Sequence, residues 1–120
     1  MGHQIIIAGT IDLADPGRRD EALERARVLQ QKTRDEEPGC LAYVFAADPC
    51  VEGRLVVHEL WQDEASLAAH FAHRNYLEMR RALGAIGLKD ASNKKYRVDL
   101  SEPVYDASSK PRADFFTARA

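Results

Sequence analysis

Three side chains near the middle of the sequence carry the functional groups needed for proton transfer on an aromatic molecule. Glu59 and Trp61 stand two residues apart in an alternating apolar segment, and His70 follows in a helical pattern. Because alternate residues of a strand point to the same face, Glu59 and Trp61 should lie side by side. An unperturbed imidazole has a pKa of about 6.5, which suits proton removal near neutral pH. We therefore expect this strand–helix corner to form one wall of a pocket for a flat organic molecule.

Glu59 and Trp61 each have two interpretations. The Trp61 indole either lines the pocket, where it stacks on an aromatic substrate and donates its N–H, or fills the core between sheet and helices. The Glu59 carboxylate needs a partner in an apolar layer, because burying it unpaired is costly. It either orients His70 or a substrate hydroxyl, or it pairs with Arg80 or Arg81 and holds a helix against the strand.

His70 also has two interpretations. It flanks the apolar stripe of its helix, with Ser66 one turn earlier on the same side. It is either a general base or an edge histidine bonded to Glu59, to Ser66 or to water. His70 and His73 lack a third ligand at a convincing spacing, so we expect no metal site. The side chains expected to wall the substrate pocket, all of which also suit a plain core, are Tyr43, Phe71, Tyr76 and Met79.

The hydrophobic pattern predicts the element order β-α-β-β-α-β, with the second helical unit split in two. Strands are expected at residues 3–11, 40–47, 54–62 and 94–101. Helices are expected at residues 16–37, begun by Asp15 and Pro16, at 63–73, begun by Asp63, and from about 75 to 87. This order is typical of the ferredoxin-like sandwich, an α+β fold in which the helices cover one face of a four-stranded antiparallel sheet.

Both faces of the predicted sheet are apolar. In the first strand, Ile5 and Ile7 share one face, whereas Ile6 and Ala8 share the other. The predicted helices cover only one of these faces, and an uncovered apolar sheet would be a large adhesive patch. We therefore expect a homodimer that packs sheet against sheet around a two-fold axis. His58 lies on the opposite face of its strand from Trp61 and should therefore face the partner subunit.

The chain divides into a domain over residues 1–101 and a polar C-terminal tail over residues 102–120. The tail contains three aromatic side chains, Tyr105, Phe115 and Phe116. We expect it either to wrap around the partner subunit or to be disordered.

Composition excludes several classes of function. The net charge is −2 and the pI is about 6.1, which does not favour nucleic acids or anionic membranes. No apolar run approaches the ~20 residues that span a bilayer, and no basic segment precedes the short apolar run 5–7 as a signal peptide would require. We expect a cytoplasmic protein in which Cys40 and Cys50 are reduced thiols.

Several segments together resemble the antibiotic biosynthesis monooxygenase (ABM) family. They are the turn Pro38-Gly39-Cys40, the strand end Glu59-Leu60-Trp61 and the helix segment Ser66-Leu67-Ala68-Ala69-His70, within a ferredoxin-like order over residues 3–101. The resemblance implies a homodimeric α+β barrel. It also implies oxygenation of a polycyclic phenol, anthrone or quinol with O2, without metal, flavin or haem.

A haem-degrading branch of the family has a different set of residues. It uses an asparagine on the first strand, a tryptophan at the end of the third and a histidine ligand on the second helical segment. Trp61 is present here, but the first strand has Ile7, Ala8 and Gly9 in that region, and Arg80 stands about where the ligand is expected. We therefore expect no haem and no other cofactor.

Two functions of different classes follow. The first is a cofactor-independent monooxygenase in which His70 removes a hydroxyl proton, Glu59 fixes the imidazole tautomer and Trp61 stacks on a small aromatic phenol or quinol that then reacts with O2. The second is a non-catalytic dimer or a module that binds a small aromatic metabolite, because fold does not determine function. An isomerase on the same scaffold would need the base but no oxygen. A cavity beside Trp61 favours the enzyme, and a solid interior favours the structural role.

Overall fold

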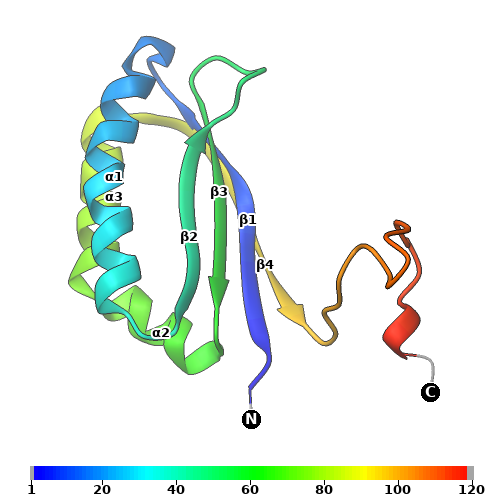
Figure 1. Cartoon of the computed structure of the whole chain (residues 1–120). Helices are drawn as coiled ribbons and strands as arrows, with labels where there is room; N and C mark the ends of the chain where they lie inside the picture. Colours follow the sequence, from blue (N-terminus) through cyan, green and yellow to red (C-terminus); the bar gives the residue numbers. More distant parts are fainter. Residues whose placement is uncertain (1, 119–120) are drawn as a thin grey trace.

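One four-stranded antiparallel sheet with helices on only one of its faces forms the body of the protein (Figure 1). The computed structural model describes residues 2–118. The strands are β1 (Gln4–Leu13), β2 (Cys40–Ala47), β3 (Arg54–Trp61) and β4 (Leu88–Val98), and their order in the sheet is β2-β3-β1-β4. The predicted ferredoxin-like α+β fold is confirmed.

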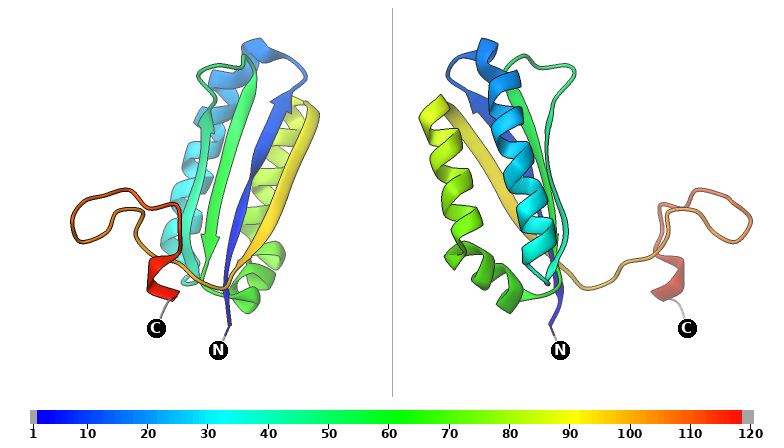
Figure 2. Two further views of the ribbon diagram at one scale, coloured as in Figure 1. Left: turned by 90° about the vertical axis from the view of Figure 1, so that its right-hand side faces the viewer. Right: turned by 60° about the vertical axis from the view of Figure 1, so that its left-hand side comes forward.

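The helices begin where capping side chains predict. A 3₁₀ turn, η1 (Pro16–Arg18), leads into α1 (Arg19–Glu36), and the Asp15 carboxylate accepts a hydrogen bond from the N–H of Gly17. Asp63 precedes α2 (Glu64–Ala72) and accepts from the N–H of Ser66 at 2.8 Å. The third helix, α3 (Arg74–Ile86), follows directly and runs beside α1 on the same face of the sheet (Figure 2). Both predicted caps satisfy backbone donors that have no partner within the helix.

The start of β4 differs from the prediction. This strand begins at Leu88, not at residue 94, and it ends at Val98, not at residue 101. Gly87 has a φ of 102°, a conformation that favours glycine, and it turns the chain directly from α3 into the strand. The first half of β4 is exposed and largely polar, so it lacks the apolar alternation on which the prediction depended.

The face of the sheet that carries the helices, here called the helix face, contains the core. Residue pairing places Tyr43, Glu59, Ile7 and Lys95 in one row across β2, β3, β1 and β4. The apolar side chains of this face pack against α1, α2 and α3, and its buried members include Ile5, Ile11, Tyr43, Phe45, Leu55, Val57 and Trp61. The predicted orientation of Ile5 and Ile7 is therefore confirmed.

The opposite face of the sheet, here called the open face, is not covered by any helix of the described chain (Figures 1 and 2). One of its rows contains Ala42, Leu60, Ile6 and Tyr96. Exposed apolar side chains lie on it, with 39% of Val56 and 51% of Tyr96 accessible. A sheet of this kind has half of its side chains without a packing partner within the subunit.

Residues 99–118 form a C-terminal arm that leaves the end of β4 and extends away from the body on the side of the open face (Figure 1). The arm is organised by its own hydrogen bonds. Tyr105 pairs with Pro111, Arg112 bonds Asp114 at 2.6 Å, and Glu102 accepts from the N–H of Phe116 at 3.0 Å. The extended arm raises the radius of gyration to 16.5 Å, whereas a compact chain of this length has roughly 14 Å.

Candidate functional site

Glu59 is a buried carboxyl group on the helix face of β3. Only 7% of the residue is exposed, and its Oε1 accepts a hydrogen bond of 2.9 Å from the indole Nε1 of Trp61. Burial raises the pKa of Glu59 to about 7, and the negative charge of Glu37 acts in the same direction, while the indole hydrogen bond opposes both. Such a group changes protonation near neutral pH, as a general base must.

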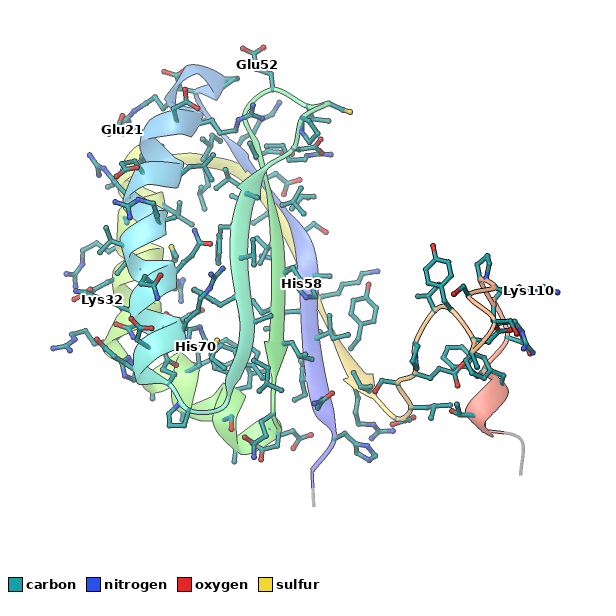
Figure 3. The ribbon with its side chains drawn as sticks, in the orientation of Figure 1. Glu21, Lys32, Glu52, His58, His70 and Lys110 are labelled. Carbon is teal, nitrogen blue, oxygen red and sulfur yellow. The ribbon has the colours of Figure 1, made fainter. Side chains whose placement is uncertain are left out.

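His70 lies between the sheet and the helices (Figure 3) and is almost completely buried. Its Nδ1 is 2.8 Å from Oε1 of Glu37, which ends α1, and the other oxygen of Glu37 accepts from Asn75 at 3.2 Å. Because the Glu37 carboxylate can only accept, Nδ1 carries the proton and Nε2 keeps its lone pair. Burial lowers the pKa of His70, although Glu37 favours the charged form. The imidazole is therefore neutral near pH 7.

Four aromatic rings surround the imidazole of His70, and the most distant of them is Phe71 at 5.9 Å. The indole of Trp61 lies 4.4 Å away at an angle of 34°, and Tyr43 and Tyr76 approach edge-on at 5.3 Å each. Trp61 thus contacts His70 with its ring and Glu59 with its N–H. The two predicted acid–base groups are connected through the indole and not through a hydrogen bond to each other.

Two cavities lie between the sheet and the helices. The first has a volume of about 800 Å³, with apolar walls that include Ile5, Ile7, Leu67 and Phe71. The second has a volume of about 520 Å³, with walls that include Tyr43, Phe45, Met79 and Leu83. Glu59, Tyr76 and Asn93 line both. Each volume falls within the usual range for a small-molecule site, and each cavity has the same carboxyl group in its wall.

Asn93 stands between the cavities because its partner across the sheet is a glycine. Gly9 of β1 pairs with Asn93 of β4. A Cβ at position 9 would come within 2.6 Å of the Cα of Asn93, so the two strands approach more closely there than any other residue would allow.

The four predicted pocket residues all line a cavity. Tyr43 and Met79 belong to the second cavity, Phe71 to the first and Tyr76 to both. Trp61 is fully buried and lines neither. It contributes instead to a smaller pocket of about 350 Å³ beside Gly39.

The partners predicted for Glu59 and His70 differ from those in the structure. Glu59 bonds Trp61 and forms no ion pair with His70, Arg80 or Arg81 in the described chain, and Arg80 lies over the ring of Tyr76 at 5.9 Å. His70 bonds Glu37, not Glu59 or Ser66. The prediction that Glu59 fixes the imidazole tautomer is therefore wrong, because Glu37 occupies that position.

Glu37, Asn75 and Asn93 were not identified from the sequence. Glu36 and Glu37 place negative charge at the C-terminus of α1, where the helix dipole disfavours it. This local conflict was the available signal, because such conflicts concentrate at functional sites. Asn75 and Asn93 had no comparable signal, since their positions depend on how α3 and β4 pack.

Neither a metal site nor a membrane span is present in residues 2–118. The described His, Cys, Asp and Glu side chains form no group of three suited to a metal ion. None of the helices combines the length and the apolar character that crossing a bilayer requires.

Comparison with known proteins identifies one family whose model matches the sequence and several solved structures with a similar fold. Residues 4–82 match the family model described as antibiotic biosynthesis monooxygenase. A solved structure from Caulobacter crescentus, named after that family, has 22% identity and a TM-score of 0.75, and the match covers 81% of this chain and 91% of that one. A Nitrosomonas europaea structure, also named after the family, has 17% identity and a TM-score of 0.72, with 82% and 93% covered.

A Pseudomonas aeruginosa structure has 24% identity and a TM-score of 0.69, with 82% of this chain and 96% of that one covered. These structural likenesses show a shared fold. No curated protein matches the sequence. Because the family model covers most of the chain, including the strand of Glu59 and Trp61 and the helix of His70, this protein belongs to the antibiotic biosynthesis monooxygenase family.

Proposed function

We propose that the protein is a cofactor-independent monooxygenase that oxidises a small aromatic phenol or quinol with O2. Family membership supports a monooxygenase-like role in general. The observation that carries the finer proposal is Glu59, a buried carboxyl group with a pKa of about 7 that lines both cavities. We assign the role of general base to Glu59 in place of His70, because His70 is 1% exposed and lines neither cavity.

In the proposed reaction, the Glu59 carboxylate takes the proton of a substrate hydroxyl. The resulting electron-rich anion transfers an electron to O2, and the two radicals combine to form a carbon–oxygen bond. The ring-bound peroxide takes the proton back from Glu59 and becomes a hydroperoxide. Its O–O bond then breaks as the oxygenated ring carbon loses its hydrogen as a proton, and the outer oxygen leaves with that proton as water. The other oxygen atom remains on the ring, so that a phenol becomes a quinone and a quinol becomes a hydroxylated quinone. The protein contributes deprotonation, orientation and the exclusion of bulk water.

The remaining polar groups position Glu59. Trp61 holds its Oε1, and the His70 ring packs against the indole. Glu37 anchors His70 from the end of α1. Removal of His70 should therefore alter the placement of Glu59, whereas removal of Glu59 should eliminate the base.

The test is oxygen consumption by the metal-stripped protein with a panel of small quinols and polycyclic phenols. With an accepted substrate, we expect the rate to rise with pH through about 7, because the base must be ionised. Glu59→Gln should lower the rate by about a hundredfold or more, the usual scale of base catalysis. The control is Glu52→Gln in the exposed β2–β3 loop (Figure 3), which should retain the full rate. A Glu59→Gln protein with normal oxygen uptake would contradict the proposal.

The second candidate function is that of a module that binds a small aromatic metabolite without converting it. The apolar cavities favour it directly, because they need no chemistry to hold a ring. Saturable binding of the same quinols with no oxygen uptake would support this function. Conversion without oxygen uptake would indicate an isomerase that uses Glu59.

We also propose that the protein is a homodimer joined through the open faces of its sheets. The exposed apolar side chains of the open face support this arrangement, since they have no partner within the subunit. The arm supports it further, because it presents Val104, Tyr105 and Phe115, each about 60% exposed, while its backbone is already ordered by internal hydrogen bonds. Both cysteines are free thiols, which fits our proposal of a cytoplasmic protein.

A further inference from the structure

One row of side chains on the helix face leads from the proposed base to a positive charge. Glu59 of β3 pairs with Ile7 of β1, and Ile7 pairs with Lys95 of β4. Residues paired across neighbouring strands project from the same face. Because strands lie about 4.8 Å apart, the backbones of Glu59 and Lys95 are roughly 10 Å apart, with Ile7 between them.

All three residues of this row line the first cavity. Ile7 provides an apolar floor, and Leu67 and Phe71 provide apolar walls from α2. Lys95 stands on the exposed edge strand at the rim. A flat ring on Ile7 would therefore have a carboxyl group at one end and an ammonium group at the other.

The ammonium group of Lys95 has no counter-ion in the part of the chain that the structure describes. No described carboxylate lies within ion-pair distance of it, although Glu64 lines the same cavity. Lys94 pairs with Ala8 and projects from the opposite face of β4, so Lys95 is the lysine of this pair whose side chain belongs to the helix face. The cavity also contains the carboxyl groups of Glu59 and Glu64, so a preference for an anionic group is confined to the Lys95 end, where the ammonium group is unpaired in the described chain and apolar walls strengthen its attraction for an anion.

We infer that the substrate is an anionic phenol or quinol, with a carboxylate at the end of the ring opposite the reacting hydroxyl. Lys95 binds the carboxylate, the ring lies on Ile7, and the hydroxyl reaches Glu59. This inference rests on the proposed function for the role of Glu59, and it adds the charge and the orientation of the substrate. Binding the carboxylate at the rim selects the one orientation in which the hydroxyl points inward.

The test is a binding measurement that needs no turnover. Titration calorimetry under nitrogen compares 4-hydroxybenzoate with its methyl ester, which has the same ring and hydroxyl but no charge. We expect the acid to bind the unmodified protein roughly fivefold or more tightly than the ester, the scale of a partly exposed ion pair. Lys95→Gln should abolish this preference and leave the affinity for the ester unchanged.

The control is Lys32→Gln on the outer surface of α1 (Figure 3), which changes the net charge equally and should keep the preference. Equal binding of acid and ester by the unmodified protein, or a preference that survives in Lys95→Gln, would overturn the inference, as would the absence of binding by both probes. The two proposals fail separately. A preference for the acid without oxygen uptake would support the anionic ligand and refute the monooxygenase. Oxygen uptake with uncharged quinols alone would support the monooxygenase and refute the anionic ligand.

Discussion

Glu59 holds its carboxyl group in an environment that stabilises the protonated form of the folded protein. A buried carboxyl group with a single indole donor lacks the hydrogen bonds that would normally compensate for lost hydration. The protein thus keeps a group that weakens its own folding at neutral pH. Positions of this kind are expected where a reaction requires a base with a raised pKa.

This cost has a measurable dependence on pH. The pKa of Glu59 is about 7 in the folded protein and about 4.5 in the unfolded chain, so the folded state binds more protons between these pH values. Its contribution to stability therefore falls as the pH rises from 4.5 to 7. Glu59→Gln cannot titrate and keeps an acceptor for Trp61, so it should be more stable than the unmodified protein at pH 8, by roughly 3 kcal/mol at most.

Urea denaturation at pH 5 and pH 8 measures this difference. The difference between Glu59→Gln and the unmodified protein should be small at pH 5 and large at pH 8. Glu52→Gln, which replaces an exposed carboxylate, should follow the unmodified protein at both values. A Glu59→Gln protein that is no more stable at pH 8 than the unmodified protein would disprove the raised pKa.

At the scale of the elements, Glu37 joins three helices at one point. It ends α1, and its two oxygens bond His70 of α2 and Asn75 of α3. Few apolar contacts hold the short α2 helix, because only Leu67 and His70 are buried in it. The position of α2, and with it the wall of the first cavity, therefore depends on this carboxylate.

Truncation of Glu37 should be correspondingly costly. Glu37→Ala leaves the His70 Nδ1–H buried without an acceptor and leaves the Asn75 amide with only its 3.3 Å hydrogen bond to Glu36, and we expect a loss of roughly 1–3 kcal/mol of unfolding free energy. Glu37→Gln retains one acceptor and should lose about half as much. Urea midpoints compare the three proteins. A Glu37→Ala protein as stable as Glu37→Gln would show that the carboxylate does not organise these helices.

Strand periodicity and distance along the chain explain which parts of the site were predictable. Alternation places Glu59 and Trp61 on one face with no knowledge of the tertiary structure, and the Asp63 cap locates α2. The partner of His70 was not predictable in this way. Glu37 comes from a distant helix end, and only the folded arrangement of the helices brings it to the imidazole. Local patterns identify faces and ends, whereas pairing between elements requires the fold.

At the scale of the whole molecule, the protein has a covered face, an open face and an arm with few contacts to its own body. The principal dimensions of 51 × 33 × 21 Å reflect this extended shape. Side chains such as Tyr105 and Phe115 are mostly exposed in this subunit, with 60% and 58% of their surface accessible. In the homodimer that we propose, a second copy would provide the apolar surface that they lack.

Light scattering on size-separated protein tests this assembly. We expect the full chain to be a dimer. Tyr105→Ser combined with Phe115→Ser should weaken the dimer about tenfold or more in dissociation constant, because two large apolar side chains lose their burial. Val28→Ser on the outer surface of α1, an exposed apolar residue away from the arm, is the matched control and should have no effect. A full chain that remains monomeric at micromolar concentration would refute the dimer.

The arm continues directly from β4, and β4 carries Lys95 and Asn93 in the wall of the first cavity. Docking of the arm on a neighbouring subunit would therefore restrain β4, the same strand that a ligand in the first cavity contacts. Thermodynamic linkage makes such an influence reciprocal, so a ligand that steadies β4 would tighten subunit association by the same factor by which association tightens the ligand. In that arrangement, the fraction of protein present as dimer would rise with the fraction of cavities that contain ligand.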